Sequence, residues 1–280
     1  MDELYNKVKY NESIAGIMII NPDNPTGAVF PPDVIAEMID IARKFDLFIV
    51  ADEIYANLVY NNADYQPISS LIRDVPAISL QGISKEMPWP GARCGWMEVY
   101  NQKGHTMFQR YVKSILDAKM LEVCSTTLPQ SVIPKIYSHP EWKSWQTHRR
   151  AFFEKRSRMV SEIFQSCPGV IVNPPSGAFY LSVVFKDKLS KEMNLRITNP
   201  QLQAFMKEID AVEMEADRKF VYQLLASQNI CVVPLSSFVT DLQGFRCTLL
   251  EQDDDRFRHI YSTIARAVTE FIDSATPARL

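Results

Sequence analysis

Residues 14–55 decide the fold, and they read IAGIMIINPDNPTGAVFPPDVIAEMIDIARKFDLFIVADEIY. Residues 14–20 are a continuous apolar run, which is typical of a strand buried on both faces of a parallel sheet. The proline-containing loop at residues 21–27 can be neither helix nor central strand. Residues 32–45 then have apolar side chains at helical spacing, and a second apolar run covers residues 47–51. This order predicts a β-loop-α-β unit that crosses over right-handedly into a parallel sheet.

A third apolar run, residues 77–80, precedes the segment Gly82-Ile83-Ser84-Lys85. All three runs end where polar, chemically capable side chains begin. In open α/β sheets, ligands bind at the carboxyl ends of the strands. We therefore expect the residues that follow the three runs to converge.

The second half of the chain indicates a smaller α+β domain that follows a long helix. We expect a large domain over residues 1–135, the connecting helix over 136–166 and the small domain over 167–280. Residues 185–215 are charged and lack a clear period, so we expect an insertion there and expect it to be mobile. The expected helices cover residues 104–123, 141–165, 216–227 and 255–274, and the expected strands cover 170–172, 178–185, 230–233 and 245–249.

Composition and charge exclude several classes of protein. The chain has 46% hydrophobic and 22% charged residues, which is ordinary for a globular protein. Its net charge is −3 and it has no basic stripe, so nucleic-acid binding has no electrostatic support. There is no apolar stretch of membrane-spanning length and no secretory signal, so we expect no membrane association and a cytoplasmic location. The five cysteines and four histidines are dispersed, and we expect no metal site.

Lys85 is the residue on which the functional interpretation depends. A lysine after a strand is, by default, a solvated surface charge. Here, however, Arg93 follows eight residues later, flanked closely by Gly91 and Gly95. An arginine fork suits the geometry of a phosphate dianion. The spacing of Lys85 and Arg93 therefore favours a functional lysine beside a phosphate-binding arginine over a solvated surface charge.

Two further motifs stand upstream in a definite order. One is Asn21-Pro-Asp-Asn24-Pro-Thr-Gly27, and the other is Asp52-Glu53-Ile54-Tyr55. Alone, the first is a turn and the second a helix cap or solvated pair. With Lys85 and Arg93, the set resembles the class I/II aminotransferases, which are fold type I enzymes that depend on pyridoxal 5'-phosphate. That resemblance implies an α/β fold with a three-layer, mostly parallel sheet in an incomplete large domain, and a smaller C-terminal α+β domain.

The resemblance also implies roles for individual residues. Lys85 forms a Schiff base with the cofactor, and it then acts as general acid and base. Asp52 pairs with the pyridine nitrogen, while Asn24 and Tyr55 reach the phenolic oxygen. Arg93 binds the phosphate.

Other positions are assigned by the same resemblance. The family often has a serine three residues before the lysine, where this chain has Gly82, so Ser84 is the candidate to replace that hydroxyl. Late in the chain, Ile230–Phe238 and Gly244–Leu249 resemble the Val-Pro strand and the arginine-containing strand of the family. Arg246 is accordingly expected to bind the substrate α-carboxylate, with Asn24 as a second substrate contact.

The largest departure from the family is at the start of the chain. The resemblance implies a sizeable N-terminal segment that contributes a phosphate-binding loop, an aromatic ring over the cofactor and part of a homodimer interface. Residues 1–14 cannot supply these features. We therefore expect a truncated subunit that exposes apolar surface and is feeble or inactive alone, whereas the full-length form is a homodimer.

Several functions stay open at this point. The leading one moves an amino group between an L-amino acid and a 2-oxo acid. A β-eliminating C–S lyase needs the same motifs, because they specify the cofactor and the α-carboxylate rather than the leaving group. A non-catalytic ligand-sensing domain or an inactive fragment is the remaining alternative. The retention of Lys85, Asp52 and Arg246 together argues against the sensing domain.

Overall fold

The computed structural model describes residues 1–190 and 192–274, and its contacts divide them into two units. The domain boundaries expected from the sequence stay a prediction, and residues 275–280 of the expected small domain lie outside the described residues. The first unit comprises residues 1–23, 28–151 and 176–178, and the second comprises residues 24–27, 152–175 and those from 179 onward.

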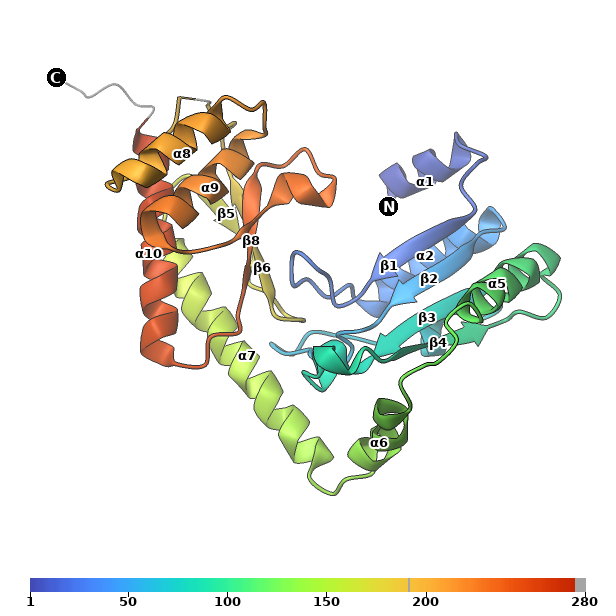
Figure 1. Ribbon diagram of the computed structural model, residues 1–280. Coiled ribbons are helices and arrows are strands. Elements are labelled where there is room, and N and C mark those ends of the chain that lie inside the picture. The colour runs from blue at the N-terminus through green and yellow to red at the C-terminus, as the bar shows by residue number, and fades with distance from the viewer. Residues whose placement is uncertain (191, 275–280) are drawn as a thin grey trace. The chain divides into compact units, whose positions relative to one another are not determined.

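The first unit is built on a sheet whose strands pair in the order β1-β2-β3-β4 (Figure 1). β1 (Gly16–Ile20), β2 (Phe48–Asp52) and β3 (Ala77–Gly82) are parallel, which confirms the predicted parallel pairing. The expectation that the first strand is buried on both faces was wrong, because Met18 at the centre of β1 is 62% exposed and Ile17 and Ile19 are buried on the opposite face. β4 (Gly95–Tyr100) pairs with β3 in the antiparallel direction, and the sequence analysis did not predict it. The sheet is thus mostly parallel.

Helices cover both faces of this sheet. Alternate residues of each strand point to opposite faces, and apolar side chains on both faces pack against helices. α2 (Pro32–Lys44) packs its apolar stripe on one face, and α5 (Thr106–Lys119) packs on the other. The result is the expected three-layer arrangement. The α2 face contains Ile17, Ile19, Ile35, Ile39, Ile49, Ala51 and Ala77, and the α5 face contains Phe48, Ile78, Leu80, Phe108 and Val112.

The remaining elements of the first unit are short, apart from one long helix that continues into the second unit. α7 begins in the first unit, to which its residues 142–151 belong. The bounds are α1 Asp2–Lys9, α3 Ile68–Leu71, α4 Ile83–Glu86, the 3-10 helix η1 Pro90–Ala92, α6 Thr127–Tyr137 and α7 Trp142–Gln165.

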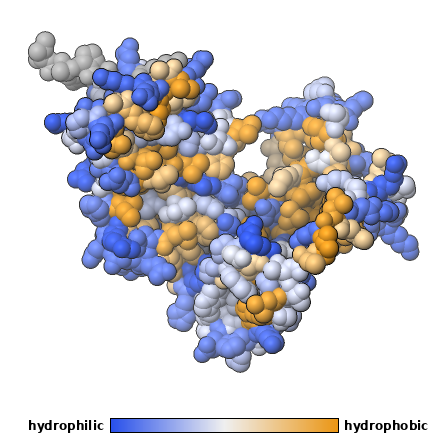
Figure 2. Space-filling model, in the orientation of Figure 1, coloured by the Kyte–Doolittle hydropathy of each residue, from blue (hydrophilic) through white to orange (hydrophobic). Residues whose placement is uncertain are grey.

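Apolar side chains are exposed where α5 ends. Leu116 is 51% exposed, and Met120, Leu121 and Val123 are each at least 80% exposed. Figure 2 shows hydrophobic surface at this end of α5. A contiguous exposed patch of this kind typically marks a surface that contacts another polypeptide.

The second unit has an antiparallel sheet in the order β5-β6-β8-β7. Its core is an aromatic cluster of Phe185, Phe220, Phe245 and Phe271, whose neighbouring ring centroids lie 5.0 to 6.3 Å apart. The α+β character expected of this part is therefore confirmed. The bounds are β5 Val170–Val172, β6 Tyr180–Phe185, α8 Pro200–Asp210, α9 Ala216–Gln228, β7 Val233–Pro234, the 3-10 helix η2 Leu235–Phe238, β8 Gly244–Thr248 and α10 Asp254–Asp273.

Helix α8 lies within residues 185–215, where the sequence shows no clear period, and the expected insertion and its mobility stay a prediction. The side chain of Asn199 caps the helix by accepting hydrogen bonds from the backbone N–H groups of Gln201 and Leu202. Pro200 occupies the first turn, where its missing N–H costs nothing. Met206 is the residue of α8 that is buried. Because α8 buries little apolar surface, its sequence shows only a weak apolar pattern, and the Asn199 cap helps to define where the helix begins.

Candidate active site

Asp52 and Lys85 both lie at the carboxyl-end edge of the first unit's parallel strands. In the register of the sheet, Asp52 is opposite Ile20 on one side and Leu80 on the other. α4 begins directly after β3 ends and carries Ser84 and Lys85. The structure therefore brings the residues that follow β2 and β3 to one edge, as the sequence predicts.

Asp52 and Tyr55 are placed by the turn that follows β2. The backbone N–H of Ile54 donates to Oδ1 of Asp52 over 3.1 Å, which orients the carboxylate. Tyr55 is only 3% exposed, so packing holds its ring. Both side chains thus come from well-fixed positions within three residues of each other in sequence.

Lys85 is half-buried within the single turn of α4. Its backbone carbonyl accepts a hydrogen bond from Nη2 of Arg149 on α7, at 3.3 Å. Ser84 is also half-buried. The lysine is therefore anchored through its backbone to a second helix of the same unit.

Arg93 follows η1 in a left-handed backbone conformation, with φ of 49°. Its side chain is exposed, and Nη1 donates to the carbonyl of Pro90 over 2.9 Å. The guanidinium thus folds back over the loop that connects it to α4.

The structure explains why glycine stands at position 82. A Cβ atom added there would lie 2.8 Å from Cδ1 of Ile54 and 3.3 Å from the carbonyl oxygen of Cys94. In addition, Gly82 pairs directly with Gly95 across β3 and β4. A serine at this position would therefore require the Ile54 side chain to move and the Cys94 carbonyl to shift slightly, and Ser84 offers the nearest hydroxyl in sequence.

Glu53 is a buried structural residue, and its sequence position gave no sign of this because it resembles a solvated neighbour of Asp52. It is 4% exposed, and its carboxylate accepts four hydrogen bonds. The sequence around Glu53 gives no local signal that it is buried and hydrogen-bonded, since its partners lie 12 to 28 residues away along the chain. The donors are the Tyr65 hydroxyl, the backbone N–H of Ile68, the Ser79 hydroxyl and the Gln81 amide.

Glu86 is a second buried carboxylate, and it directly follows Lys85. It is 3% exposed; Oε1 accepts from Nδ2 of Asn57 at 2.6 Å, and Oε2 accepts from the Tyr137 hydroxyl at 3.4 Å. Burial raises the pKa of Glu86, while these two hydrogen bonds and the nearby Arg149 and Arg150 act in the opposite direction. The carboxylate therefore carries a net cost when it is charged in the folded protein.

This cost predicts how stability responds to pH when Glu86 is changed to Gln. Because the folded-state pKa of Glu86 lies above its unfolded value, its stabilising contribution is full below the unfolded pKa and is lost as pH rises through the folded pKa. Chemical denaturation between about pH 4 and about pH 8 should show the variant gaining free energy of unfolding relative to the wild type as pH rises. A difference that stays flat, or that falls with pH, would contradict this.

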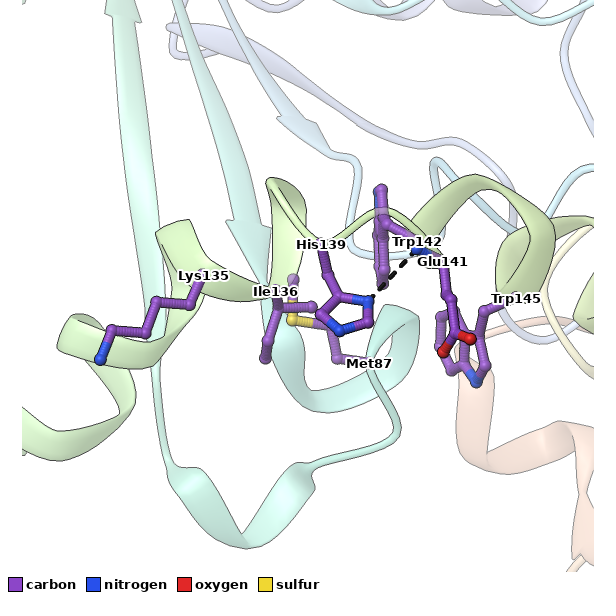
Figure 3. Close-up of a pocket in the computed structure, with 7 residues that line it drawn as sticks. All are labelled: Met87, Lys135, Ile136, His139, Glu141, Trp142 and Trp145. Atoms are coloured by element: carbon purple, nitrogen blue, oxygen red, sulfur yellow. Dashed lines mark hydrogen bonds between the residues drawn. The ribbon is translucent and has the colours of Figure 1, made fainter.

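A cavity of about 390 Å³ adjoins α4 in the first unit. Figure 3 shows His139 and Ile136 on one side and the indoles of Trp142 and Trp145 on the other, whereas Lys135 points away. The two indoles stack with centroids 5.1 Å apart, and the backbone N–H of Glu141 donates to Nδ1 of His139. The complete lining is Met87, Lys135, Ile136, His139, Glu141, Trp142 and Trp145.

In the second unit, β8 presents Arg246 and the loop at residues 24–27 presents Asn24. Nη1 of Arg246 donates to Oδ1 of Asn24 over 2.9 Å. The guanidinium carbon lies 4.6 Å from the centroid of the Tyr180 ring and 5.0 Å from that of Phe238. Two aromatic faces and an amide oxygen therefore fix the orientation of this arginine.

The side chains of the first unit have the chemistry that pyridoxal phosphate requires. Asp52 offers an acceptor for a ring N–H, Tyr55 a hydroxyl for a phenolic oxygen, and Lys85 an amine for an aldehyde. Ser84 and Arg93 offer a hydroxyl and a guanidinium for a phosphate. Because these side chains follow strands that end at the same sheet edge, they fit a single pyridoxal phosphate site.

Two negative findings apply to residues 1–190 and 192–274. None of the helices there combines the length and apolar character needed to cross a bilayer. That same part of the chain holds no group of three or more His, Cys, Asp or Glu side chains arranged to bind a metal ion.

Comparison with known proteins places these features in context. The family described as "Aminotransferase class I and II" matches residues 1–261. The chain is 50% identical to an uncharacterized aminotransferase of Methanocaldococcus jannaschii over 273 residues, which are 97% of this chain and 63% of that protein. It is 35% identical over 184 residues to a tyrosine aminotransferase of Caenorhabditis elegans, covering 65% of this chain and 39% of that one. A solved aminotransferase of Escherichia coli matches with a TM-score of 0.75 and 25% identity, over 94% of this chain and 59% of that chain. The chain thus spans less than two thirds of the length of these relatives.

Proposed function

Because the chain belongs to the class I and II aminotransferase family, we propose that it moves an amino group between an L-amino acid and a 2-oxo acid with pyridoxal phosphate as cofactor. The observation that carries this proposal is the collection of Asp52, Tyr55, Ser84 and Lys85 at one edge of the parallel strands. A surface lysine with no function would need none of these neighbours. The family supplies the reaction class, and the donor set supports the cofactor.

Lys85 is the residue that we propose holds the cofactor covalently and moves the proton. When bound, the cofactor supplies an electron sink that stabilises negative charge at the substrate α-carbon. With the cofactor bound, the amine Nζ of Lys85 would be the group that takes up and gives back the substrate's α-proton, acting as base and acid in turn.

Asp52 and Tyr55 hold the ring in the orientation that this proton transfer needs. The Asp52 carboxylate, oriented by the N–H of Ile54, would accept a charge-assisted hydrogen bond from the ring nitrogen of a bound cofactor. The hydroxyl of Tyr55 would donate to the phenolic oxygen of a bound cofactor. Arg93 and Ser84 would bind the phosphate of a bound cofactor through a guanidinium and a hydroxyl.

Arg246 is the residue that we propose binds the substrate α-carboxylate. A planar guanidinium makes two parallel hydrogen bonds to a carboxylate, which fixes orientation as well as charge. The contacts with Asn24, Tyr180 and Phe238 support this role, since they hold the guanidinium in one orientation before substrate arrives. Asn24 is thereby a positioning partner of Arg246 as well as a contact for substrate.

The exposed apolar end of α5 supports the proposal that the full-length form is a homodimer. Leu116, Met120, Leu121 and Val123 would be costly to leave in water, and subunit interfaces bury such side chains. The activity proposed here is accordingly that of the whole protein.

A donor panel tests the reaction class. Purified protein loaded with pyridoxal phosphate is incubated with single L-amino acids and with 2-oxoglutarate, and the products are followed by chromatography. We expect a new amino acid to form from the oxo acid in equal amount to the donor consumed. Pyruvate and ammonia released from a cysteine conjugate without any oxo acid would instead support the C–S lyase.

A further inference from the structure

We propose that Glu86, Asn57 and Arg149 are positioning residues for Lys85, which together set the direction in which its side chain leaves α4. This proposal rests on the proposed function, because it assumes that Lys85 carries the chemistry. It adds residues that no motif of the sequence singled out.

Helix α4 cannot hold its own shape. It consists of four residues, Ile83–Glu86, and a single helical turn fixes several backbone angles in return for few hydrogen bonds. Its geometry must therefore come from tertiary contacts. Successive residues of a helix are rotated by about 100°, so that fixing the side chain of Glu86 also fixes the direction of Lys85.

The contacts of Glu86 supply the first restraint. Oε1 accepts from Nδ2 of Asn57 at 2.6 Å, and Oε2 accepts from the hydroxyl of Tyr137 on α6. Asn57 stands two residues after Tyr55 in the turn that follows β2. The Glu86–Asn57 bond therefore joins the segment of Lys85 to the segment that carries Asp52 and Tyr55.

Two successive arginines of α7 supply the second restraint. Nη2 of Arg149 donates to the backbone carbonyl of Lys85 at 3.3 Å, and Nε of Arg150 donates to the backbone carbonyl of Asn57 at 3.2 Å. The same helix therefore holds both segments through their main chains. The Arg149 guanidinium also lies 5.0 Å from the centroid of the Trp145 ring, which restricts its movement.

Aromatic side chains that line the cavity of Figure 3 support the residues that restrain Lys85. Trp145 contacts Arg149, and Trp142 packs edge-on against the ring of Tyr137 at 5.2 Å. Met87, which follows Glu86, completes the connection between the cavity wall and α4. Each of the two indoles thus supports one of the side chains that restrain Lys85 or Glu86.

The energetics favour a functional reason for Glu86. Its charge is buried among Asn57, Tyr65, Tyr137, Arg149 and Arg150, and burial raises its pKa. Because burial disfavours the charged form, the ionised carboxylate of Glu86 lowers the free energy of unfolding relative to a carboxylate that stays in water. Each carboxylate oxygen of Glu86 accepts one hydrogen bond, and these two contacts restrict the side chain to one orientation.

Hydrogen–deuterium exchange of the cofactor-free full chain, followed by mass spectrometry, tests the proposal. In Glu86→Ala, we expect the amides of residues 83–89 to exchange about tenfold faster, while those of β1 are unchanged. Glu86→Gln should restore most of the protection, because its amide oxygen can still accept from Asn57. Glu141→Ala, which removes an exposed carboxylate at the same cavity, is the matched control and should match the wild type.

A kinetic readout separates positioning from general destabilisation. In the cofactor-loaded protein, Glu86→Ala should lower kcat about tenfold and leave KM within about twofold, because the carboxylate acts through Lys85 and not on the substrate. If Glu86→Ala does not fold, Tyr137→Phe and Arg149→Met should each give a smaller change of the same kind. Unchanged exchange at residues 83–89, or equal acceleration throughout the unit, would overturn the proposal.

The exchange result is independent of the proposed function. If the wild type binds no cofactor through Lys85 but exchange still rises locally in Glu86→Ala, the proposed function fails and the structural restraint remains. If cofactor attaches to Lys85 and exchange does not change, only the positioning role is lost.

Discussion

Replacing Lys85 by Ala should lower kcat/KM by at least about 10³-fold, because the protein loses both the covalent link to the cofactor and the base that moves the proton. Borohydride reduction of the cofactor-loaded wild type, followed by peptide mass spectrometry, should find the cofactor attached at residue 85. The Ala variant should carry no attached cofactor after the same treatment. Lys85→Arg should be equally inactive, since a guanidinium keeps the charge but cannot form the link.

The control for Lys85 is another lysine of the same unit. Lys103 is exposed in the turn before α5, and Lys103→Ala should keep wild-type kinetics and cofactor attachment. Thermal unfolding of all three variants checks that they are folded. Attachment of the cofactor at a different residue of the wild type, or activity that persists in Lys85→Ala, would show that the chemistry belongs elsewhere.

Replacing Arg246 by Lys should raise KM for the amino acid about 10²-fold, with a smaller effect on kcat. A lysine keeps the positive charge, but it loses the two parallel hydrogen bonds to the carboxylate and the stacking on Tyr180 and Phe238. Charge-assisted contacts of this kind are worth several kcal/mol when they are shielded from water, which sets the expected size. Initial rates over a range of donor concentrations measure the effect.

A matched substitution on the same unit controls for general effects of arginine removal. Arg258 is exposed on α10, and Arg258→Lys should leave both constants unchanged. Asn24→Ala should produce a weaker version of the Arg246 effect, because it removes the oxygen that accepts from Nη1. Equal KM values for Arg246→Lys and the wild type would remove Arg246 from substrate binding.

Much of the first unit could be predicted because its signals are local. The apolar runs at residues 14–20, 47–51 and 77–80 became the parallel strands β1 to β3, since the strands of a helix-covered parallel sheet are rich in apolar residues. Met18 of β1 is nevertheless 62% exposed, so the apolar run did not predict burial on both faces there. The helical period of residues 32–45 became α2. The positions of Asp52 and Lys85 followed from the rule that side chains after parallel strands meet at one edge.

Elements with weak local patterns were missed. β4 lies between Cys94 and Asn101 and has no alternation that separates it from a loop, so its pairing with β3 decides its conformation. α6 contains Pro134, and an internal proline is normally a sign against a helix, so the sequence did not predict this element. The strand expected at residues 230–233 is present only at Val233–Pro234, where pairing with β8 begins.

The amino-acid sequence by itself was sufficient to indicate the family, through the order and spacing of Asn24, Asp52, Lys85 and Arg93. The tertiary structure decided what holds Lys85 in place. Glu53 and Glu86 look like solvated charges in sequence, yet both are buried and hydrogen-bonded. The physical reason is distance along the chain, because a carboxylate's cost or benefit depends on donors that only folding brings to it.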